Sequence, residues 1–299
     1  MATVGVFDGV HRGHQQIIAR ARALADEHGL PAVLVTFSPH PASVVRPGSQ
    51  PPLLATLTRR AELAESFGID VVLFLPFTTE FSQLLPEQFV HQAVVADLHA
   101  AAVVVGENFR FGHRAAGDVP LLQTFGDRWG FDAEGVPLLQ NGHHPISSTY
   151  IRSCVQAGDV AAAAAALGRP HRLDGVVVRG DQRGRDLGFP TANLRADGQA
   201  AVPADGVYAG RVVRLDEWGN TRTDVPARPA AISVGTNPTF EGLHQSVEAY
   251  ILDFDGDLYG QNLGVEFVHR LRGMHRYDAI ADLVTQMAED VRQTRELMA

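Results

Sequence analysis

The chain contains no lysine, because all 25 of its Lys and Arg residues are Arg. This absence excludes a phosphate-loop lysine, a Schiff-base lysine and a catalytic lysine pair. Any binding of phosphate must therefore depend on Arg, His and backbone amides. The net charge of −9 also argues against a nucleic-acid-binding protein, which would need a basic surface.

Cysteine and long apolar runs are scarce as well. The single cysteine, Cys154, cannot form an internal disulfide. No apolar run approaches the roughly 20 residues that cross a bilayer, and no basic-then-apolar signal precedes the first motif. We therefore expect a cytoplasmic protein with no membrane role, and the sequence leaves a homo-oligomer open.

The 299 residues are enough for two domains of ordinary size. In the first half, short apolar runs alternate with amphipathic stretches, which predicts an α/β domain with a parallel sheet. The predicted strands are residues 2–7, 32–37, 71–75 and 101–105. A helix is predicted to begin near His14 and to stop at Gly29.

The second half has a different pattern. Six alanines at 161–166 form a helix that ends near Gly168, and strands then follow one another at 176–178, 207–215, 231–234, 246–252 and 263–268. This pattern predicts an antiparallel β-barrel. A closing helix from about Asp278 should pack on it through apolar residues at helical spacing, namely Ile280, Leu283, Val284, Met287 and Val291. We place the domains at 1–160 and 168–299 and expect the second to fold alone.

A glycine-rich segment with two histidines follows the first predicted strand. Residues 5–15 read GVFDGVHRGHQ, so His11 and His14 stand at the start of the helix. The unpaired N–H groups and the positive end of the helix dipole favour an anion there, and Gly13 lets the backbone come close. The segment therefore predicts a phosphate site with further contacts from Gly5, Phe7, Asp8 and Gly9.

The residues His11-Arg12-Gly13-His14 resemble the HxGH signature of nucleotidylyltransferases, and residues 5–15 are similar to the form found in prokaryotic FAD synthetases. The segments GENFRFG (106–112) and ISSTYIR (146–152) resemble the same family. The resemblance implies a Rossmann-like nucleotidyltransferase domain with helices on both faces of its sheet. In this domain the FMN phosphate would attack the α-phosphorus of ATP.

The same resemblance assigns roles to individual residues. It implies that His11 and His14 stabilise the transition state and that Asn108 and Phe111 bind the flavin. Without the surrounding motif, an Asn after a strand would be interpreted as a turn residue. It also implies that the outer phosphates are held by Ser147, Ser148, Thr149 and Arg152.

A second glycine-rich segment opens the barrel domain. Residues 180–193 read GDQRGRDLGFPTAN, in which Thr191 and Asn193 offer oxygen ligands suited to Mg²⁺. The segment is similar to the GRxLGFPTAN stretch of flavokinases, and this match implies a barrel of the riboflavin kinase type. It also implies ATP contacts from Gly180, Arg183, Gly184, Arg185 and Gly188.

An acidic residue lies in a later strand of the barrel. Alternation predicts that Glu248, Tyr250 and Leu252 share one face of this strand. Taken without its surroundings, a Glu in such a strand would be interpreted as an exposed residue of an edge strand. The resemblance implies that Glu248 is the general base for the riboflavin 5′-hydroxyl, and that Arg272 and Tyr277 bind the flavin. Position 273 has Gly where the family usually has an acid, and position 277 has Tyr where Phe is common.

Together the motifs cover nearly the whole chain, which resembles the prokaryotic bifunctional riboflavin kinase/FMN adenylyltransferases. This family uses ATP and Mg²⁺ to convert riboflavin to FMN and FMN to FAD. One alternative is an adenylyltransferase for pantetheine phosphate, nicotinate mononucleotide or glycerol phosphate, which the kinase-like barrel opposes. Another is a flavin-sensing protein without turnover, which the intact catalytic residues oppose.

Overall fold

The computed structural model describes residues 1–142, 144–180, 184, 187–239 and 242–299. By its internal packing the chain divides into two units. The first unit consists of Met1–Pro51 and Arg60–Ser147, and the second of Pro52–Arg59 and Ser148–Ala299. The alanine-rich helix α8 (Val160–Leu167) belongs to the second unit, as does α7 (Ser148–Ala157).

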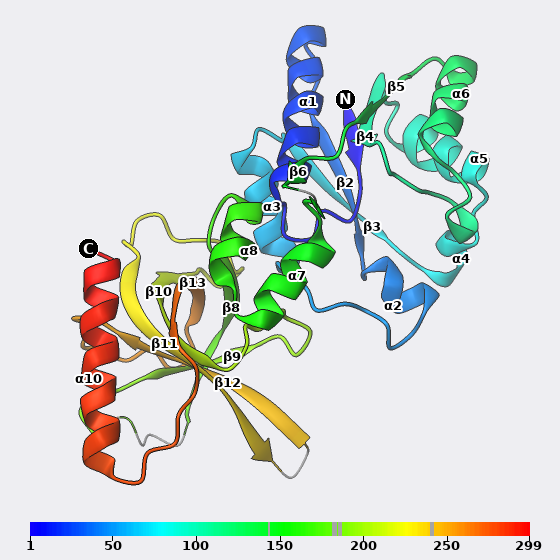
Figure 1. Ribbon diagram of the computed structural model, residues 1–299. Coiled ribbons are helices and arrows are strands. Elements are labelled where there is room, and N and C mark those ends of the chain that lie inside the picture. Colours follow the sequence, from blue (N-terminus) through cyan, green and yellow to red (C-terminus); the bar gives the residue numbers. More distant parts are fainter. Residues whose placement is uncertain (143, 181–183, 185–186, 240–241) are drawn as a thin grey trace. The chain divides into compact units, whose positions relative to one another are not determined.

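The first unit contains a parallel five-stranded sheet with the strand order β3-β2-β1-β4-β5 (Figure 1). Its strands are β1 (Ala2–Val4), β2 (Val33–Ser38), β3 (Val71–Pro76), β4 (Ala102–Gly106) and β5 (Asp132–Val136), and β6 (Gln140–Asn141) and β7 (His144–Pro145) form a small separate pair. The helices are α1 (Arg12–His28), α2 (Pro41–Val45), α3 (Leu57–Ser66, of which the part from Arg60 lies in this unit), α4 (Thr79–Ser82), α5 (Pro86–Phe89), η1 (Val90–Asp97), η2 (His113–Ala115) and α6 (Val119–Trp129). This arrangement confirms the predicted α/β fold.

Neighbouring residues of one strand pack into different cores, because side chains alternate across a sheet. Leu34 belongs to a core that also contains Ile18 of α1 and Leu63 of α3. Val35 belongs to a core on the opposite face, with Val90 of η1 and Leu122 of α6. The sheet therefore has helices on both faces, as predicted.

The second unit is built on a closed antiparallel barrel with the strand order β10-β11-β12-β9-β8-β13. Its strands are β8 (His171–Val178), β9 (Ala192–Ala196), β10 (Gly206–Arg214), β11 (Arg228–Thr239), β12 (Gly242–Ile251) and β13 (Asn262–Arg272). The last helix, α10 (Ile280–Leu297), lies against β10, β11 and β13 (Figure 1). The predicted barrel and closing helix are confirmed.

Some details differ from the sequence predictions. Strands β5 and β9 were not predicted, because DAEGV and ANLRA lack an apolar run or a clear alternation. Leu252 lies beyond the end of β12 and is buried, so only Glu248 and Tyr250 share the outward face of that strand. Ile280 is 70% exposed in the first turn of α10, whereas Leu283, Met287 and Val291 line a cavity next to the barrel.

Candidate active sites

The loop after β1 is held in an unusual backbone conformation. Phe7 and Val10 have φ angles of 50° and 38°, in the left-handed region, and Gly9 has a φ of 78°. A bulky or β-branched residue rarely adopts such a conformation, which costs on the order of 1–3 kcal/mol. Both side chains are buried, and packing therefore offsets the strain and fixes the loop ahead of α1.

The two histidines of this loop lie face to face. Their ring centroids are 3.6 Å apart with an interplanar angle of 15°, and Nδ1 of His11 accepts a hydrogen bond of 3.3 Å from the His14 backbone N–H. A Cβ atom on Gly13 would lie 3.2 Å from the His11 ring. The glycine therefore provides the room in which the stack forms, at the N-terminus of α1.

Asp8 has a different environment from the one expected of a phosphate contact. Its side chain is 1% exposed and lies 3.6 Å from Nη2 of Arg60, which is 2% exposed. Arg60 also donates to the Thr36 hydroxyl, which in turn donates to the Val6 carbonyl. Asp8 and Arg60 therefore support the loop from inside the unit.

The loop after β4 lies at the same end of the sheet. Strand order reverses between β1 and β4, and ligands of open α/β sheets bind at the carboxyl ends of such strands. A Cβ on Gly106 would lie 3.5 Å from Ile17 of α1 and 3.2 Å from Oδ1 of Asn108. The topology therefore brings Asn108 to the end of the sheet that carries the two histidines.

Phe111, which the resemblance implies as a flavin contact, is a buried residue in the structure. Phe111 is 5% exposed and belongs to the core, where it lies between Phe89 and Phe109. The rings of Phe109 and Phe111 are stacked with centroids 5.6 Å apart, and Phe109 is only half-buried. Phe109 is thus the more accessible ring of the stacked pair.

The ISSTYIR segment begins a helix, as predicted. Ser148 and Thr149 form the first turn of α7, and Ser147 directly precedes it. Nε of Arg152 donates a hydrogen bond of 2.7 Å to the Pro52 carbonyl within the second unit. The hydroxyls therefore lie where a helix N-terminus attracts anions.

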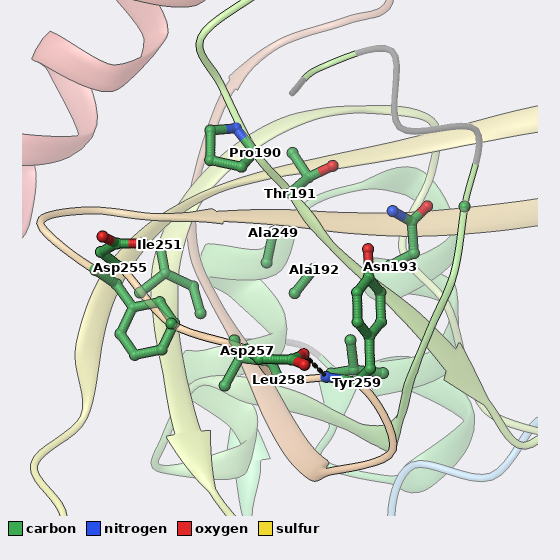
Figure 2. Close-up of a pocket in the computed structure, with 14 residues that line it drawn as sticks. Pro190, Thr191, Ala192, Asn193, Ala249, Ile251, Asp255, Asp257, Leu258 and Tyr259 are labelled. Carbon is green, nitrogen blue, oxygen red and sulfur yellow. Dashed lines mark hydrogen bonds between the residues drawn. The ribbon is translucent and has the colours of Figure 1, made fainter. Parts of the chain in front are cut away.

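A cavity of the barrel, with a volume of about 560 Å³, is lined by Thr191 and Asn193 and by Asp255, Asp257 and Tyr259 (Figure 2). Figure 2 shows the Tyr259 hydroxyl pointing toward the Asn193 amide. A Cβ on Gly180 would lie 2.4 Å from Oδ1 of Asn193. Only glycine at position 180 therefore leaves the Asn193 amide in this place.

Thr191 also reaches a second cavity. This cavity has a volume of about 250 Å³ and is lined by Thr191, Glu248 and Arg272 together with apolar residues of the barrel and α10. The Thr191 hydroxyl donates a hydrogen bond of 3.0 Å to Oε2 of Glu248. Thr191 therefore lies in the wall that the two cavities share, with Glu248 on the side of the smaller one.

Three polar residues that line the second cavity, Glu248, Ser233 and Arg272, lie on one row across the barrel wall. Register pairs Glu248 with Asn193 on one side and with Ser233 on the other, then Ser233 with Val207 and Val207 with Arg272. Residues directly opposite each other point to the same face of a sheet. The three strand intervals from Glu248 to Arg272, each about 4.8 Å, give a separation of roughly 14 Å along the wall.

Some of the remaining predicted residues of the barrel line the second cavity, and two of them lie outside the described residues. Arg272 and Tyr277 line the second cavity together, and the Arg272 guanidinium lies 6.0 Å from the Tyr277 ring. Gly184 lines the same cavity and accepts hydrogen bonds from the backbones of Leu187 and Phe189, while Gly188 has a φ of 84°. Arg183 and Arg185 lie outside the described residues.

Thr191 and Asn193 have the oxygen donors that Mg²⁺ prefers. This ion commonly takes only one or two protein ligands and completes its shell with water and substrate phosphates. The close contact between Gly180 and Asn193 holds one of these oxygens beside a cavity large enough for phosphates. In the described part of the chain no cluster of three His, Cys, Asp or Glu side chains could hold a metal.

Comparison with known proteins agrees with this division into two sites. Residues 1–150 match the family described as FAD synthetase, and residues 167–298 match the family described as riboflavin kinase. The bifunctional riboflavin kinase/FMN adenylyltransferase of Pseudomonas fluorescens is 37% identical over 300 residues, which cover 100% of this chain and 93% of the relative. The chain belongs to the bifunctional riboflavin kinase/FMN adenylyltransferase family.

Other members of the family support the same conclusion. The Escherichia coli K12 enzyme is 34% identical over 294 residues, with 98% of this chain and 91% of the relative covered. A crystal structure from Streptococcus pneumoniae, described as a macrolide-efflux protein, has a TM-score of 0.87 and 31% identity and covers 98% of this chain and 93% of its own. This chain therefore resembles that protein in both fold and sequence. Among the described helices none is long and apolar enough to cross a membrane.

Several lining residues of this family member were not found by sequence reasoning. Ser233, Met274 and Asp290 lie in β11, in the segment after β13 and in α10, and only the barrel register and the packing of α10 bring them to the second cavity. An alternation pattern marks Ser233 as outward-facing but cannot show which residue stands beside it.

Proposed function

We propose that the barrel, within residues 168–299, phosphorylates riboflavin to FMN and that residues 1–160 transfer AMP from ATP to FMN to form FAD. The observation that carries the kinase assignment is the Thr191–Glu248 hydrogen bond in the wall between the two barrel cavities. One cavity has a volume of about 560 Å³ and several polar lining residues, which suits a nucleotide. The other is mainly apolar, which suits a flavin ring.

In the kinase reaction Glu248 accepts the proton of the riboflavin 5′-hydroxyl while that oxygen attacks the γ-phosphorus of ATP. ADP then leaves from the larger cavity. A positioned general base of this kind contributes about 10² to 10⁴ in rate. Because Thr191 donates to Oε2 of Glu248, we assign Oε1 to the substrate hydroxyl.

Thr191 and Asn193 would hold Mg²⁺ through their side-chain oxygens. When bound with ATP, this ion supplies positive charge to the phosphate oxygens. The chain itself contributes positioning, because phosphoryl transfer depends mainly on alignment and on charge stabilisation. Gly180 contributes indirectly, since it keeps the Asn193 amide in place.

In the adenylyl transfer the FMN phosphate attacks the α-phosphorus of ATP and pyrophosphate leaves, without a covalent enzyme intermediate. The stacked rings of His11 and His14, with the N-terminal amides of α1, stabilise the charge that develops on the α-phosphate. Gly5, Phe7, Gly9 and Gly13 shape the loop. Ser147, Ser148, Thr149 and Arg152 hold the outer phosphates, and Asn108 with the accessible ring of Phe109 contacts the flavin.

Incubation of the purified protein with riboflavin and Mg-ATP, followed by chromatographic separation of the flavins, tests the whole proposal. We expect FMN to appear first and FAD to follow. A parallel reaction with FMN and ATP isolates the second step. Absence of both products from a folded protein would overturn the proposal, and FAD formed only from added FMN would overturn its kinase half.

A further inference from the structure

Helix α7 is held by the barrel near its C-terminal end. The Ala157 carbonyl accepts a hydrogen bond of 3.1 Å from Nη1 of Arg270 in β13, and the Val155 carbonyl accepts one of 3.2 Å from the backbone N–H of Ala204. Arg270 also donates from Nη2 to the Asp205 carbonyl at 3.0 Å. The last carbonyls of a helix lack regular partners within it, so these bonds fix the end of α7 to the barrel.

Gly158 provides the room for this contact. It has a φ of 74°, and a Cβ there would lie 2.8 Å from Nη1 of Arg270 and 2.8 Å from the Tyr208 hydroxyl. That hydroxyl donates to the Ala204 carbonyl, and the Arg270 guanidinium lies 6.0 Å from the Tyr208 ring. Arg270, Tyr208 and Ala204 therefore form a close-packed corner of the barrel on which α7 ends.

A second contact comes from a distant part of the sequence. Residues Pro52–Arg59, here called the strap, pack with the barrel unit. The backbone N–H of Leu53 donates to the Gln199 carbonyl at 2.6 Å, and the Leu53 carbonyl accepts from the N–H of Ala201 at 2.8 Å. These two bonds make a short parallel bridge to the segment between β9 and β10. The barrel therefore fixes the backbone of the strap.

The strap in turn fixes the side chain of Arg152. The Pro52 carbonyl accepts a hydrogen bond of 2.7 Å from Nε of Arg152. A guanidinium is a rigid planar fork, so a bond to Nε sets the direction of the two terminal nitrogens. Ser148 and Thr149 precede Arg152 by four and three residues, and residues at these spacings share one face of a helix. The two hydroxyls and the aimed fork therefore form one group at the start of α7.

We propose that the barrel positions α7 for the adenylyl transfer, through Arg270 at one end of the helix and through the strap and Arg152 at the other. This inference rests on the proposed transferase function, in which Arg152 and the hydroxyls of Ser148 and Thr149 hold the outer phosphates of ATP. Arg270 and Leu53 act through other residues, and neither lines the two barrel cavities described above. They are therefore positioning residues that serve the transferase and not the kinase.

The reaction itself supplies a specific readout. The outer phosphates of ATP leave as pyrophosphate, whereas FMN contributes the attacking phosphate oxygen. A poorly aimed Arg152 therefore weakens the binding of ATP and leaves the binding of FMN unchanged. General damage to the protein would affect both substrates, and damage to the barrel would also slow riboflavin phosphorylation.

The first test replaces Arg270 by Met in the full-length protein, which removes both of its hydrogen bonds and keeps an unbranched side chain. We expect the KM for ATP in FAD formation from added FMN to rise about three- to tenfold, the net value of one or two hydrogen bonds. The KM for FMN and the rate of riboflavin phosphorylation should stay within about twofold of the parent. An unchanged KM for ATP would overturn the inference.

Arg222→Met is the matched control. Arg222 is an exposed residue of the same unit, and its described ion pair, at 2.6 Å, is with Asp224. The variant leaves the described contacts of α7 and of the strap intact, so all three kinetic parameters should match those of the parent. Equal changes in Arg270→Met and Arg222→Met would show that a lost surface charge alters ATP binding, and this result would also overturn the inference.

The second test determines whether the strap acts through Arg152. Leu53→Pro removes the N–H that donates to Gln199 but leaves the Pro52 carbonyl, and it should raise the KM for ATP about three- to tenfold. In a protein that already carries Arg152→Gln it should cause no further rise, because residues that act through each other give non-additive effects. Fully additive effects would contradict the positioning role of the strap.

The outcomes separate this inference from the proposed function. If Leu53→Pro does not fold, Thr58→Val supplies the same comparison, because it removes the hydrogen bond of 3.1 Å from the Thr58 hydroxyl to the Trp218 carbonyl at the other end of the strap. Absence of FAD formation by the parent would overturn the transferase function itself. FAD formation by the parent, together with an unchanged KM for ATP in the variants, would overturn only the positioning role of the barrel.

Discussion

The Thr191 hydroxyl is hydrogen-bonded to Oε2 of Glu248 at 3.0 Å, and the two residues come from parts of the chain that are far apart in sequence. Thr191 directly precedes β9, and Glu248 lies in β12. Thr191 borders both cavities, whereas Glu248 borders the smaller one. This hydrogen bond therefore links the borders of the two cavities that we propose for the nucleotide and for the flavin.

Replacement of Glu248 by Gln should stop the kinase and spare the transferase. Gln has nearly the same shape but cannot accept the hydroxyl proton, so FMN formation should fall by about 10² to 10⁴. FAD formation from added FMN should keep its parent rate. Both rates are measured by chromatography on protein shown to be folded by circular dichroism. Glu217→Gln, at an exposed turn, is the matched control, and an unchanged kinase rate in Glu248→Gln would make Glu248 a structural residue.

Replacement of His14 by Ala should have the opposite effect. Removing one preorganised donor from a developing charge costs on the order of 10² to 10³ in rate, so FAD formation should drop by that factor. FMN should then accumulate when riboflavin and ATP are supplied together. His28→Ala removes an exposed histidine from the last turn of the same helix and should change neither step. Equal loss in both variants would indicate damage to the helix.

Replacement of Gly180 by Ala should weaken the Mg-ATP site without removing the base. The added Cβ would lie 2.4 Å from Oδ1 of Asn193 and must displace that amide. We expect the KM for Mg-ATP in the kinase reaction to rise about tenfold or more, which corresponds to the loss of one good ligand contact. Gly198→Ala is the control, because nothing lies within 4 Å of its added Cβ. Matching kinetics in the two variants would contradict the assigned role of Asn193.

The barrel should be more stable as a fragment that begins at Ser148 than as one that begins at Gly168. Val160 of α8 is 1% exposed within the barrel core, and Arg270 donates to the Ala157 carbonyl at 3.1 Å. Loss of the Val160 contact alone removes about 1.5–3 kcal/mol of stability. Urea unfolding of fragments 148–299 and 168–299 measures the difference, and riboflavin phosphorylation tests function. Equal midpoints would show that α7 and α8 contribute nothing to the barrel.

Acid should weaken the first unit through Asp70. Its carboxylate accepts hydrogen bonds from the Ala32 backbone N–H at 2.7 Å and from Arg22 at 2.6 Å, and these lower the pKa of Asp70. A lowered folded pKa gives stability that is present above the unfolded value, about 3.9, and is lost as the pH falls through the folded value. Asp70→Asn should therefore lower the Tm at pH 7, and the gap should close below about pH 4. The exposed Asp127→Asn should show no such gap at any pH.

Local patterns in the sequence predicted most of the fold. The helix that ends at Gly29 was predicted from its apolar spacing, and Gly29 indeed has a left-handed φ of 63°. Strand β9 escaped prediction because its five residues include only one fully buried side chain, Leu194. Its place in the barrel comes from pairing with β8 and β12 on either side.

The chemistry of the sites was predictable in part. Motifs marked His11, His14, Thr191, Asn193 and Glu248, because such residue types recur at fixed spacing. They could not show that Phe111 is buried under Phe109 or that Asp290 holds Arg272, since both facts depend on packing between distant elements. The role of each predicted site residue stays a prediction until the variants are measured.

The closed ring of barrel strands fixes the distance between residues that lie on different strands. A barrel has no free edge, so one strand cannot slide past its neighbours without breaking the hydrogen bonds around the ring. The separation between Glu248 and Arg272 along the row that runs through Ser233 and Val207 is therefore as rigid as the barrel itself. A flavin whose side chain is one carbon shorter could therefore place its ring at Arg272 but not its hydroxyl at Glu248. We expect such a flavin to bind well but to be phosphorylated slowly.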